Sequence, residues 1–358
     1  MAEQNRYTVD GYFFTQRVSG IQRYSIELLA ELDRILEPGE LEIAVPPHTP
    51  TPAYRNIRVV EVASGAGWEQ FAYPRYLRRS GRRWLCTCNI IPLLARRCEG
   101  IAVLHDVCYR ARPDFYTSLR GRASAAWHRA QYAAIAAKAR RIITVSAFSK
   151  SEIMHYYRVP AEKISVVYNA WQHMGRTAAD ETIFDGAGKW PALKPGEYYF
   201  SMANLLKNKN FPWVLRAAQK KPGAVFAIAG SGSLTAEAMR LGLADLPNVV
   251  YLGYVSDGEA KALMAHCKAF LFPTLYEGFG IPPLEAIACG APQVLVSDTP
   301  CMREIYGTHA SYLSLGSNAG DVDDVTPGTN AAGVLARYSW AQSARRVAAI
   351  LRGAGEQP

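Results

Sequence analysis

Two glutamates that flank a glycine-containing loop are the residues of this chain best suited to chemistry. An apolar run ends at Phe272, Glu277 follows, and Gly278 and Gly280 precede two prolines that begin a helix carrying Glu285. Glycines let backbone N–H groups approach a ligand closely, and a helix N-terminus favours an anion. The pattern predicts a loop that binds an anionic or hydroxyl-rich ligand, although two ordinary surface acids fit it equally well.

Other polar residues also follow predicted strands. His105 and Asp106 come directly after an apolar run, and Gly230 and Gly232 follow another. Lys209 lies in a KNKN motif just before a predicted helix. Taken alone, a histidine at a strand end is more often a structural residue than a functional one. The function of these positions therefore depends on the strands and helices that place them.

Short β-rich runs alternate with helical stretches along the whole chain, which predicts an α/β protein with parallel sheets. In the first half we expect strands at 7–9, 41–45, 57–62, 101–105, 141–145 and 164–168, with helices at 21–36, 121–138 and 147–158. In the second half we expect strands at 197–202, 224–229, 248–252, 268–272 and 292–296, with helices at 211–219, 256–266, 282–289 and 340–351.

The chain length and one interruption of this pattern predict two domains. At 358 residues the chain is long for a single domain, and residues 174–195 have the glycine, proline and polar composition of a linker. We expect domains at 1–173 and 196–338, with a final helix in 339–358 that returns to the first domain. In such sheets, ligands bind at the carboxyl ends of the strands. Two domains of this kind therefore predict a cleft with one substrate on each side.

The composition is that of a folded globular protein. It is 49% hydrophobic and 20% charged, which excludes wholesale disorder. No run approaches the roughly 18 apolar residues of a membrane span, and the first residues lack the pattern of a signal peptide. The seven cysteines are scattered without a CxxC pair, which predicts reduced thiols. We therefore expect a cytoplasmic protein.

All of the net positive charge lies in the first half. Residues 1–173 contain 24 Lys and Arg against 15 Asp and Glu, whereas residues 174–358 contain 16 of each kind. No acid occurs between Gln70 and Cys98, a stretch that holds seven arginines interleaved with aromatic residues. These arginines are Arg75, Arg78, Arg79, Arg82, Arg83, Arg96 and Arg97. The stretch predicts contact with an anionic membrane surface, or else a solvated basic face, while no nucleic-acid motif accompanies it.

Taken together, these segments resemble the retaining glycosyltransferases of family 4, which have the GT-B fold. The spacing E-x7-E from Glu277 to Glu285, with GFG and a proline between, resembles the family signature. Other segments agree in order along the chain: VSGIQRYSIELL, VLHDV, ITVSAFSKSEI, KNKNFPWVLRA, FAIAGSGS and NVVYLGYVSD. The resemblance implies two Rossmann-like doubly wound domains facing a cleft, and transfer of a sugar from a nucleotide diphosphate.

The resemblance also implies roles for single residues. Glu277 would hold donor-sugar hydroxyls, Lys209 would neutralise the diphosphate, and His105 would contact the reacting sugar. Asp106 would either orient the acceptor or cap its loop. The remaining donor-binding expectations are Gly20 at the diphosphate, Glu285 at the ribose, Gly230, Gly232, Tyr254 and Val255 near the nucleotide, and Phe279 and Gly280 through their amides.

The chain departs from the family pattern at the diphosphate. Ala203 stands where the family often has an arginine, so Asn204 or Lys207 is expected to assist Lys209. The first loop has one glycine where many members have two, and residues 310–338 lack the usual donor-domain ending. The cluster Asp321, Asp323 and Asp324 lacks the spacing of a calcium loop, and the resemblance implies a transfer step without metal or other cofactor.

The expected function is retaining transfer of a hexose from GDP-mannose, dTDP-rhamnose or a UDP-hexose to a glycan or polyprenyl-diphosphate-linked acceptor. The resemblance places it in bacterial surface polysaccharide synthesis, of lipopolysaccharide or capsule, at the inner face of the membrane. A nucleotide-sugar epimerase or hydrolase on the same fold is one alternative. A non-catalytic protein that binds glycan or membrane is the other.

Overall fold

The computed structural model forms two compact units. It describes residues 6–63, 67–95, 98–185, 193–230, 246–316, 320–323, 325–326 and 328–353. Unit 1 consists of Met1–Asn169 with Trp340–Pro358, and unit 2 of Ala170–Ser339. Unit 2 includes residues 174–185, the described part of the segment with linker composition. The short helix α6 (Gln172–Arg176) overlaps the start of this segment.

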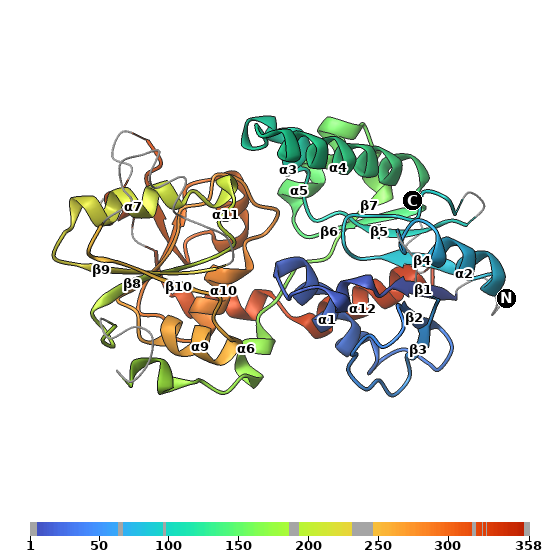
Figure 1. The fold of residues 1–358 in the computed structure, drawn as a ribbon, viewed down its shortest axis with the longest axis horizontal. Coiled ribbons are helices and arrows are strands. Elements are labelled where there is room, and N and C mark those ends of the chain that lie inside the picture. Colours follow the sequence, from blue (N-terminus) through green and yellow to red (C-terminus); the bar gives the residue numbers. More distant parts are fainter. Residues whose placement is uncertain are drawn as a thin grey trace. The chain divides into compact units, whose positions relative to one another are not determined.

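Unit 1 is built on a seven-stranded parallel sheet in the order β3-β2-β1-β4-β5-β6-β7 (Figure 1). The strands are β1 (Tyr7–Asp10), β2 (Leu41–Val45), β3 (Arg58–Glu61), β4 (Arg83–Cys86), β5 (Gly100–Val103), β6 (Arg141–Thr144) and β7 (Ile164–Val166). Its helices include α1 (Gly20–Leu32), α2 (Ala72–Ser80), α3 (Cys108–Ala111), α4 (Leu119–Lys138), α5 (Ala147–Tyr157) and α12 (Trp340–Leu351).

Unit 2 repeats this topology in the order β10-β9-β8-β11-β12-β13-β14, with only the last pair antiparallel. The strands are β8 (Tyr198–Met202), β9 (Val225–Ala229), β10 (Val249–Gly253), β11 (Ala269–Phe272), β12 (Val294–Ser297), β13 (Ser311–Leu313) and β14 (Val325–Thr326). Besides α6, its helices include α7 (Phe211–Lys220), α9 (Asp257–Ala265), α10 (Ile281–Ala288) and α11 (Pro300–Tyr306).

The strand order reverses at one place in each sheet, and this places the candidate sites. In unit 1 the reversal lies between β1 and β4, and in unit 2 it lies between β8 and β11. Loops from neighbouring strands part at such a reversal and leave a crevice at the carboxyl ends of the strands. Functional residues are therefore expected in the loops after β1, β4, β8 and β11.

The structure confirms the expected fold of two parallel-dominated sheets covered by helices. Strands β1, β2, β5, β11 and β12 are buried along their whole length, as expected of parallel sheets covered on both faces. The expected strands and helices are all present, with ends shifted by a few residues.

Several elements were not predicted from the sequence. Helix α2 and strand β4 together occupy the basic stretch, where the arginines mask the short apolar pattern. Residues 310–338, whose fold the sequence left open, contain β13, β14 and a 3₁₀ segment, Ala331–Arg337.

The final helix, α12, belongs to unit 1 and lies beside α1 (Figure 1). The Trp340 ring is buried and meets the Tyr24 ring edge-on, with centroids 5.9 Å apart. The Ser343 hydroxyl donates to the Tyr168 carbonyl at 2.6 Å, and Arg352 pairs with Glu40 at 2.8 Å. The last described residues of the chain thus help to hold the first unit together.

Candidate functional site

In unit 2 the two loops at the strand-order reversal are joined by an ion pair. Lys209, in the turn after β8, places Nζ 2.5 Å from Oε1 of Glu277, in the loop after β11. The buried Thr274 hydroxyl donates to the same oxygen at 2.8 Å. Both contacts use Oε1, and no described residue bonds Oε2, so the carboxylate can hold Lys209 and still accept a ligand hydroxyl. Sequence reasoning selected both charged residues but not their mutual contact or Thr274.

The asparagines of the KNKN motif also join these two loops by hydrogen bonds. The Asn210 amide donates to the Pro273 carbonyl at 3.0 Å, and the Asn208 amide donates to the Tyr276 carbonyl at 3.2 Å. The Leu275 N–H donates to the Asn208 carbonyl at 2.7 Å. Asn210 has a left-handed backbone conformation, φ 54°, which asparagine tolerates better than most residues. The motif therefore fixes the loop that carries Glu277 as well as presenting Lys209.

Glu285 lies in the second turn of α10 and is held by a histidine that sequence reasoning missed. Nε2–H of His173, on α6, donates to Glu285 Oε1 at 2.7 Å, and both side chains are buried. The contact joins residues 112 positions apart, so no local pattern reveals it. It fixes the direction of the Glu285 carboxyl group.

The two described glycines of unit 2 that were predicted to bind the donor have structural reasons to be glycine. Gly280 caps α10 with φ 80°, and a Cβ there would lie 2.8 Å from Met302 Cε. Gly230 has φ 152°, and a Cβ would lie 1.7 Å from the Ala203 carbonyl oxygen. The fold alone accounts for both residues, so their identity adds no independent support for ligand binding.

The remaining predicted residues of unit 2 lie around these strand ends. Phe279 is buried, with its ring edge-on to Tyr338 at 5.3 Å. After β10, Tyr254 is 54% exposed, whereas Val255 is buried. Asn204 and Lys207 are exposed, and the help that either gives Lys209 at a diphosphate stays a prediction. Gly232 lies outside the described residues.

In unit 1, His105 follows β5 and is fixed by three backbone and side-chain contacts. Its N–H donates to Asn89 Oδ1 at 2.8 Å, its carbonyl accepts from the Ser149 hydroxyl, and Nε2 lies 2.8 Å from the Thr87 carbonyl oxygen. A carbonyl only accepts, so Nε2 carries the proton and Nδ1 is left as an acceptor. Burial lowers the pKa of His105 to about 4, so the ring is neutral at pH 7.

Gly20 and Asp106 are the other two predicted site residues of unit 1, and the fold gives a structural reason only for the second. Gly20 is the first residue of α1, and a Cβ there would meet no atom within 4 Å, so packing does not require glycine. A helix start without a side chain is suited to close approach by an anion. Asp106 accepts from the N–H of Cys108, the first residue of α3, at 2.8 Å, while its role toward an acceptor stays a prediction.

A pair of acids beside the unit 1 reversal was missed by sequence reasoning. Asp10 ends β1 and is 7% exposed, and Glu69 lies close enough to act on it electrostatically. Burial raises the pKa of both carboxyl groups, and Glu69 further raises that of Asp10. The described residues place no Lys or Arg in an ion pair with either acid. The only sequence signal for Asp10 is its position as the acid that ends the first β-rich run.

Burial disfavours ionisation of the two cysteines near this reversal. Cys86 and Cys88 are free thiols, and burial raises the pKa of both, that of Cys88 to about 12. Thiols that stay protonated are poor nucleophiles and poor metal ligands. Across the described ranges, no group of three or more His, Cys, Asp and Glu side chains gathers in a way that could hold a metal ion, and Asp324 lies outside those ranges.

Sequence profiles of two related families match most of the chain. Residues 18–171 match the profile described as "Glycosyltransferase Family 4", and residues 188–320 match "Glycosyl transferases group 1". The first match contains Gly20 and His105, and the second contains Lys209, Glu277 and Glu285.

Curated relatives carry related names. The chain is 28% identical over 257 residues to "O-antigen chain mannosyltransferase RfbU" of Salmonella typhimurium, covering 69% of this chain and 66% of that protein. It is 30% identical over 203 residues to "O-antigen chain mannosyltransferase B" of Escherichia coli, covering 52% and 50%. The chain thus spans about two thirds and one half of the length of these relatives.

Solved structures match over nearly the whole chain. Anabaena HepE in complex with UDP-glucose superimposes with a TM-score of 0.70 at 14% identity, covering 97% of this chain and 99% of that one. Sucrose-phosphate synthase from Thermosynechococcus elongatus gives a TM-score of 0.73 at 12% identity, covering 97% and 98%. At such identities the likeness establishes the fold, and the fold is GT-B.

Proposed function

This chain belongs to the family 4 glycosyltransferases, and on that premise we propose that it transfers a hexose from a nucleotide-diphosphate sugar to a glycan or lipid-linked glycan acceptor. The observation that carries the proposal is the Lys209–Glu277 ion pair at the strand-order reversal of unit 2. It puts a cation for a diphosphate beside a carboxylate for sugar hydroxyls, within a segment that matches the family profile.

The donor is one of the nucleotide sugars named from the sequence, and the relatives favour mannose. Both curated relatives described above are O-antigen mannosyltransferases, which also supports a place in bacterial surface polysaccharide synthesis. We therefore propose GDP-mannose as the first donor to test, followed by dTDP-rhamnose and UDP-hexoses.

We propose retaining transfer that needs no metal ion or cofactor. Lys209 has three N–H donors and uses one on Glu277, so it can stabilise the charge that develops on the departing diphosphate. Glu277 holds donor-sugar hydroxyls through Oε2. The acceptor hydroxyl attacks from the side on which the diphosphate leaves, and the diphosphate itself takes the proton.

Two further groups support this step. The neutral His105 ring accepts a hydrogen bond from a sugar hydroxyl through Nδ1, which adds no charge beside the reacting carbon. The Glu285 carboxyl group, oriented by His173, accepts from the ribose hydroxyls. Each residue thus acts as a fixed donor or acceptor, and none serves as a covalent nucleophile.

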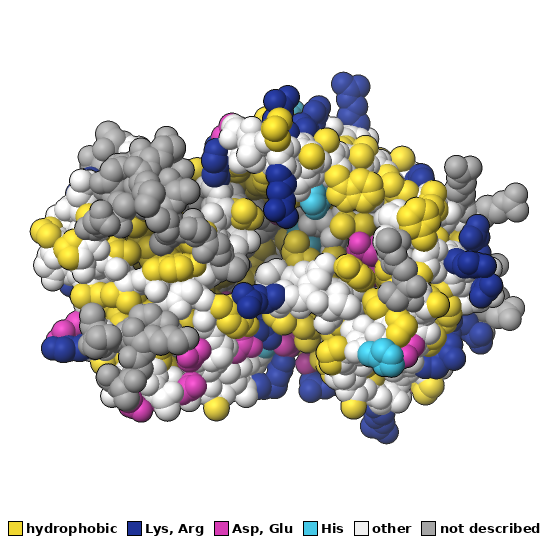
Figure 2. Space-filling view, viewed as in Figure 1, with side chains coloured by type: hydrophobic (Ala, Val, Ile, Leu, Met, Phe, Trp, Pro, Cys, Tyr) yellow, Lys and Arg dark blue, Asp and Glu magenta, His cyan; other side chains and the backbone are white. Residues whose placement is uncertain are grey.

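We further propose that the protein works at an anionic membrane surface. Arg75, Arg78 and Arg79 are exposed on α2, and Figure 2 shows dark blue side chains gathered at the edge of unit 1 where Figure 1 places α2. No described helix is long and apolar enough to cross a bilayer. Attachment through surface charge, with about 1 kcal/mol for each basic residue near the headgroups, fits both observations.

Transfer of radiolabelled sugar from each candidate donor to a lipid-linked glycan fraction tests the proposal. We expect one donor to give labelled glycan, with turnover abolished in Glu277→Ala and Lys209→Ala. Lys194→Ala, an exposed lysine of the same unit, should leave it unchanged. Label released equally fast without acceptor would instead identify a hydrolase or epimerase. Full transfer by Lys209→Ala would remove the role given to that residue.

A further inference from the structure

Asn89 is a buried polar residue beside His105 that no step of the proposed transfer uses. It lies in the loop after β4, at the strand-order reversal of unit 1, and is 6% exposed. Its Oδ1 atom accepts the His105 N–H at 2.8 Å, which orients the planar amide group. Because a backbone N–H needs an acceptor, Oδ1 faces His105, and the nitrogen Nδ2 with its two N–H donors lies on the other side of Cγ.

The donors on Nδ2 have no partner among the described residues. Within that part of the chain, the only hydrogen bond of the Asn89 side chain is the one that Oδ1 accepts. Nδ2 does not belong to the fully buried polar atoms that lack a partner, so part of its surface is open. The same is true of Nδ1 of His105, the acceptor that its ring leaves free. Two residues in direct contact therefore present open donors and an open acceptor.

Neighbouring side chains hold both groups in one orientation. Nε2 of His105 donates to the Thr87 carbonyl at 2.8 Å, and the Thr87 hydroxyl accepts from Ser25, on α1, at 2.7 Å. The Tyr24 ring, also on α1, meets the imidazole edge-on with centroids 4.8 Å apart. Groups that are already ordered lose little freedom when a ligand binds.

Two structural demands also suit an asparagine at position 89. Its backbone is left-handed, with φ 62°, and its Oδ1 atom satisfies the buried His105 N–H. Aspartate would meet both demands, because it tolerates the left-handed region and offers the same oxygen atom. Only the donors on Nδ2 distinguish asparagine from aspartate here, and these donors are what a ligand can use.

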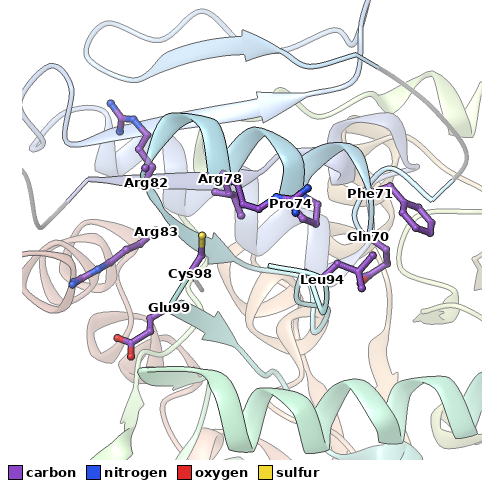
Figure 3. A pocket seen from close by; sticks show the side chains of 11 residues that line it. Gln70, Phe71, Pro74, Arg78, Arg82, Arg83, Leu94, Cys98 and Glu99 are labelled. Carbon is purple, nitrogen blue, oxygen red and sulfur yellow. The ribbon is translucent and has the colours of Figure 1, made fainter. Parts of the chain in front are cut away.

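The open donors do not belong to the groove that runs along α2 (Figure 3). Arg83 and Glu99 line that groove; the first begins β4 and the second directly precedes β5, so they lie at the amino edge of the sheet. Asn89 follows β4 at the carboxyl edge and is not among the residues that line the groove. Its donors are therefore at the edge of the sheet where ligands bind in such folds.

We propose that Asn89 is a substrate-binding residue, whose Nδ2 amide donates to a sugar hydroxyl next to the one that His105 binds. The inference rests on the proposed transfer and on the role given there to His105. Each hydroxyl group can donate one hydrogen bond and accept others, so donors beside an acceptor match two neighbouring hydroxyls of one sugar. This sugar is either the transferred hexose or the end of the acceptor glycan, since both carry the same chemistry.

Asn89→Asp tests the contact, because it removes the donors and keeps the rest of the side chain. We expect kcat/KM for transfer to fall about 10- to 100-fold, since the sugar oxygen then meets an acceptor instead of a donor. The matched control is Asn56→Asp, which adds the same charge to unit 1 and removes an amide donor to the Asp33 carbonyl at 2.8 Å. The control should leave kcat/KM unchanged. Full transfer by Asn89→Asp would overturn the proposal.

Deoxy sugars provide the second arm and identify the hydroxyl group. Each hydroxyl of the donor hexose and of the terminal acceptor sugar is removed in turn. One deoxy substrate should lower kcat/KM of the wild type by the same factor and lower that of Asn89→Asp little further, because the contact is already absent there. Its position, on the donor or on the acceptor, shows which sugar Asn89 binds. Equal losses in both proteins for every deoxy substrate would contradict the contact.

The fold and the wild-type activity keep the outcomes separate. Circular dichroism checks the fold of Asn89→Asp, and Asn89→Gly, which keeps the left-handed backbone, replaces it in both arms if it does not fold. An active wild type with equally active Asn89 variants would refute this inference alone. A wild type that transfers no sugar would refute the proposed function and, with it, the contact that rests on it.

Discussion

Single residues at the two strand-order reversals differ in charge. In unit 2 a cation and a carboxylate, Lys209 and Glu277, neutralise each other and stay available to a ligand through their remaining donors and acceptor. In unit 1 two acids, Asp10 and Glu69, lie close enough to interact electrostatically, and neither forms an ion pair with a described Lys or Arg. Buried like charges reduce stability, so proteins tend to keep them where a ligand uses them.

The acid pair makes the stability of unit 1 depend on pH. Because the folded pKa of Asp10 lies above the ordinary 3.8, the folded state binds the proton more tightly, and stability falls as the pH rises from there through the folded pKa. Asp10→Asn removes this penalty. We expect the variant to be more stable than wild type at about pH 8, with a smaller difference at about pH 5.

Chemical denaturation at both pH values measures the effect of Asp10→Asn. The matched control is Asp114→Asn, an exposed acid of the same unit, which should change stability little at either pH. A loss of stability in Asp10→Asn that is equal at both pH values would show that the carboxyl group has a structural role.

His105 should contribute to transfer as a neutral hydrogen-bond acceptor. Its pKa of about 4 keeps the ring uncharged through the physiological range. His105→Asn should lower kcat about 10- to 100-fold, by the same factor at about pH 5.5 and about pH 8. A loss confined to low pH would reveal a charged imidazole and contradict this role. Circular dichroism of the variant checks that the fold is intact.

At the scale of elements, the candidate site depends on two loops that are tied together before any ligand binds. The turn after β8 and the loop after β11 share the Asn210–Pro273 and Asn208–Tyr276 hydrogen bonds in addition to the ion pair. Preorganised donors and acceptors of this kind need no rearrangement as charge develops. The asparagines of the KNKN motif therefore position the residues that act on the donor.

Replacing one of these asparagines isolates its contribution. Asn210→Gly keeps the left-handed backbone but removes the amide that donates to Pro273. We expect a loss of about 1 to 2 kcal/mol in unfolding free energy and a lower kcat. Asn330→Gly, at an exposed left-handed asparagine of the same unit, should change stability by only a few tenths of a kcal/mol. Equal effects in the two variants would mean that the Asn210–Pro273 hydrogen bond contributes nothing to stability or turnover.

The sequence predicted local features well and contacts between distant segments poorly. The strand and helix periodicity identified most elements, and the family signature selected Lys209 and Glu277. The pairing of these two residues joins positions 68 apart, and Glu285 meets His173 across 112 positions. Helix α2 escaped prediction because three arginines among its nine residues obscure its short apolar pattern.

At the scale of the whole molecule, the chain returns to unit 1 after completing unit 2. Trp340 is almost fully buried against α1, so α12 is part of the unit 1 core although it comes last in sequence. Loss of such a residue leaves a large cavity. Damage to α12 should therefore weaken unit 1 and spare unit 2.

Trp340→Ala tests this connection. We expect a loss of about 3 to 5 kcal/mol in unit 1, seen as faster hydrogen exchange in β1 and α1 with little change in β8 and β11. Trp127→Ala, at a 42% exposed tryptophan of α4, is the control and should cost far less. Faster exchange in unit 2 alone would contradict the assignment of α12 to unit 1.

Binding of nucleoside diphosphates is the measurement that tests the central claim most directly. Thermal unfolding of wild type, Lys209→Ala and Lys194→Ala is followed with GDP, UDP, dTDP and their sugar conjugates. A ligand at 100 times its dissociation constant stabilises by about 2.7 kcal/mol. We predict that one nucleotide gives a clear, saturable shift in wild type and Lys194→Ala and that Lys209→Ala loses it. No shift with any nucleotide, or a full shift in Lys209→Ala, would contradict a donor site built on the Lys209–Glu277 pair.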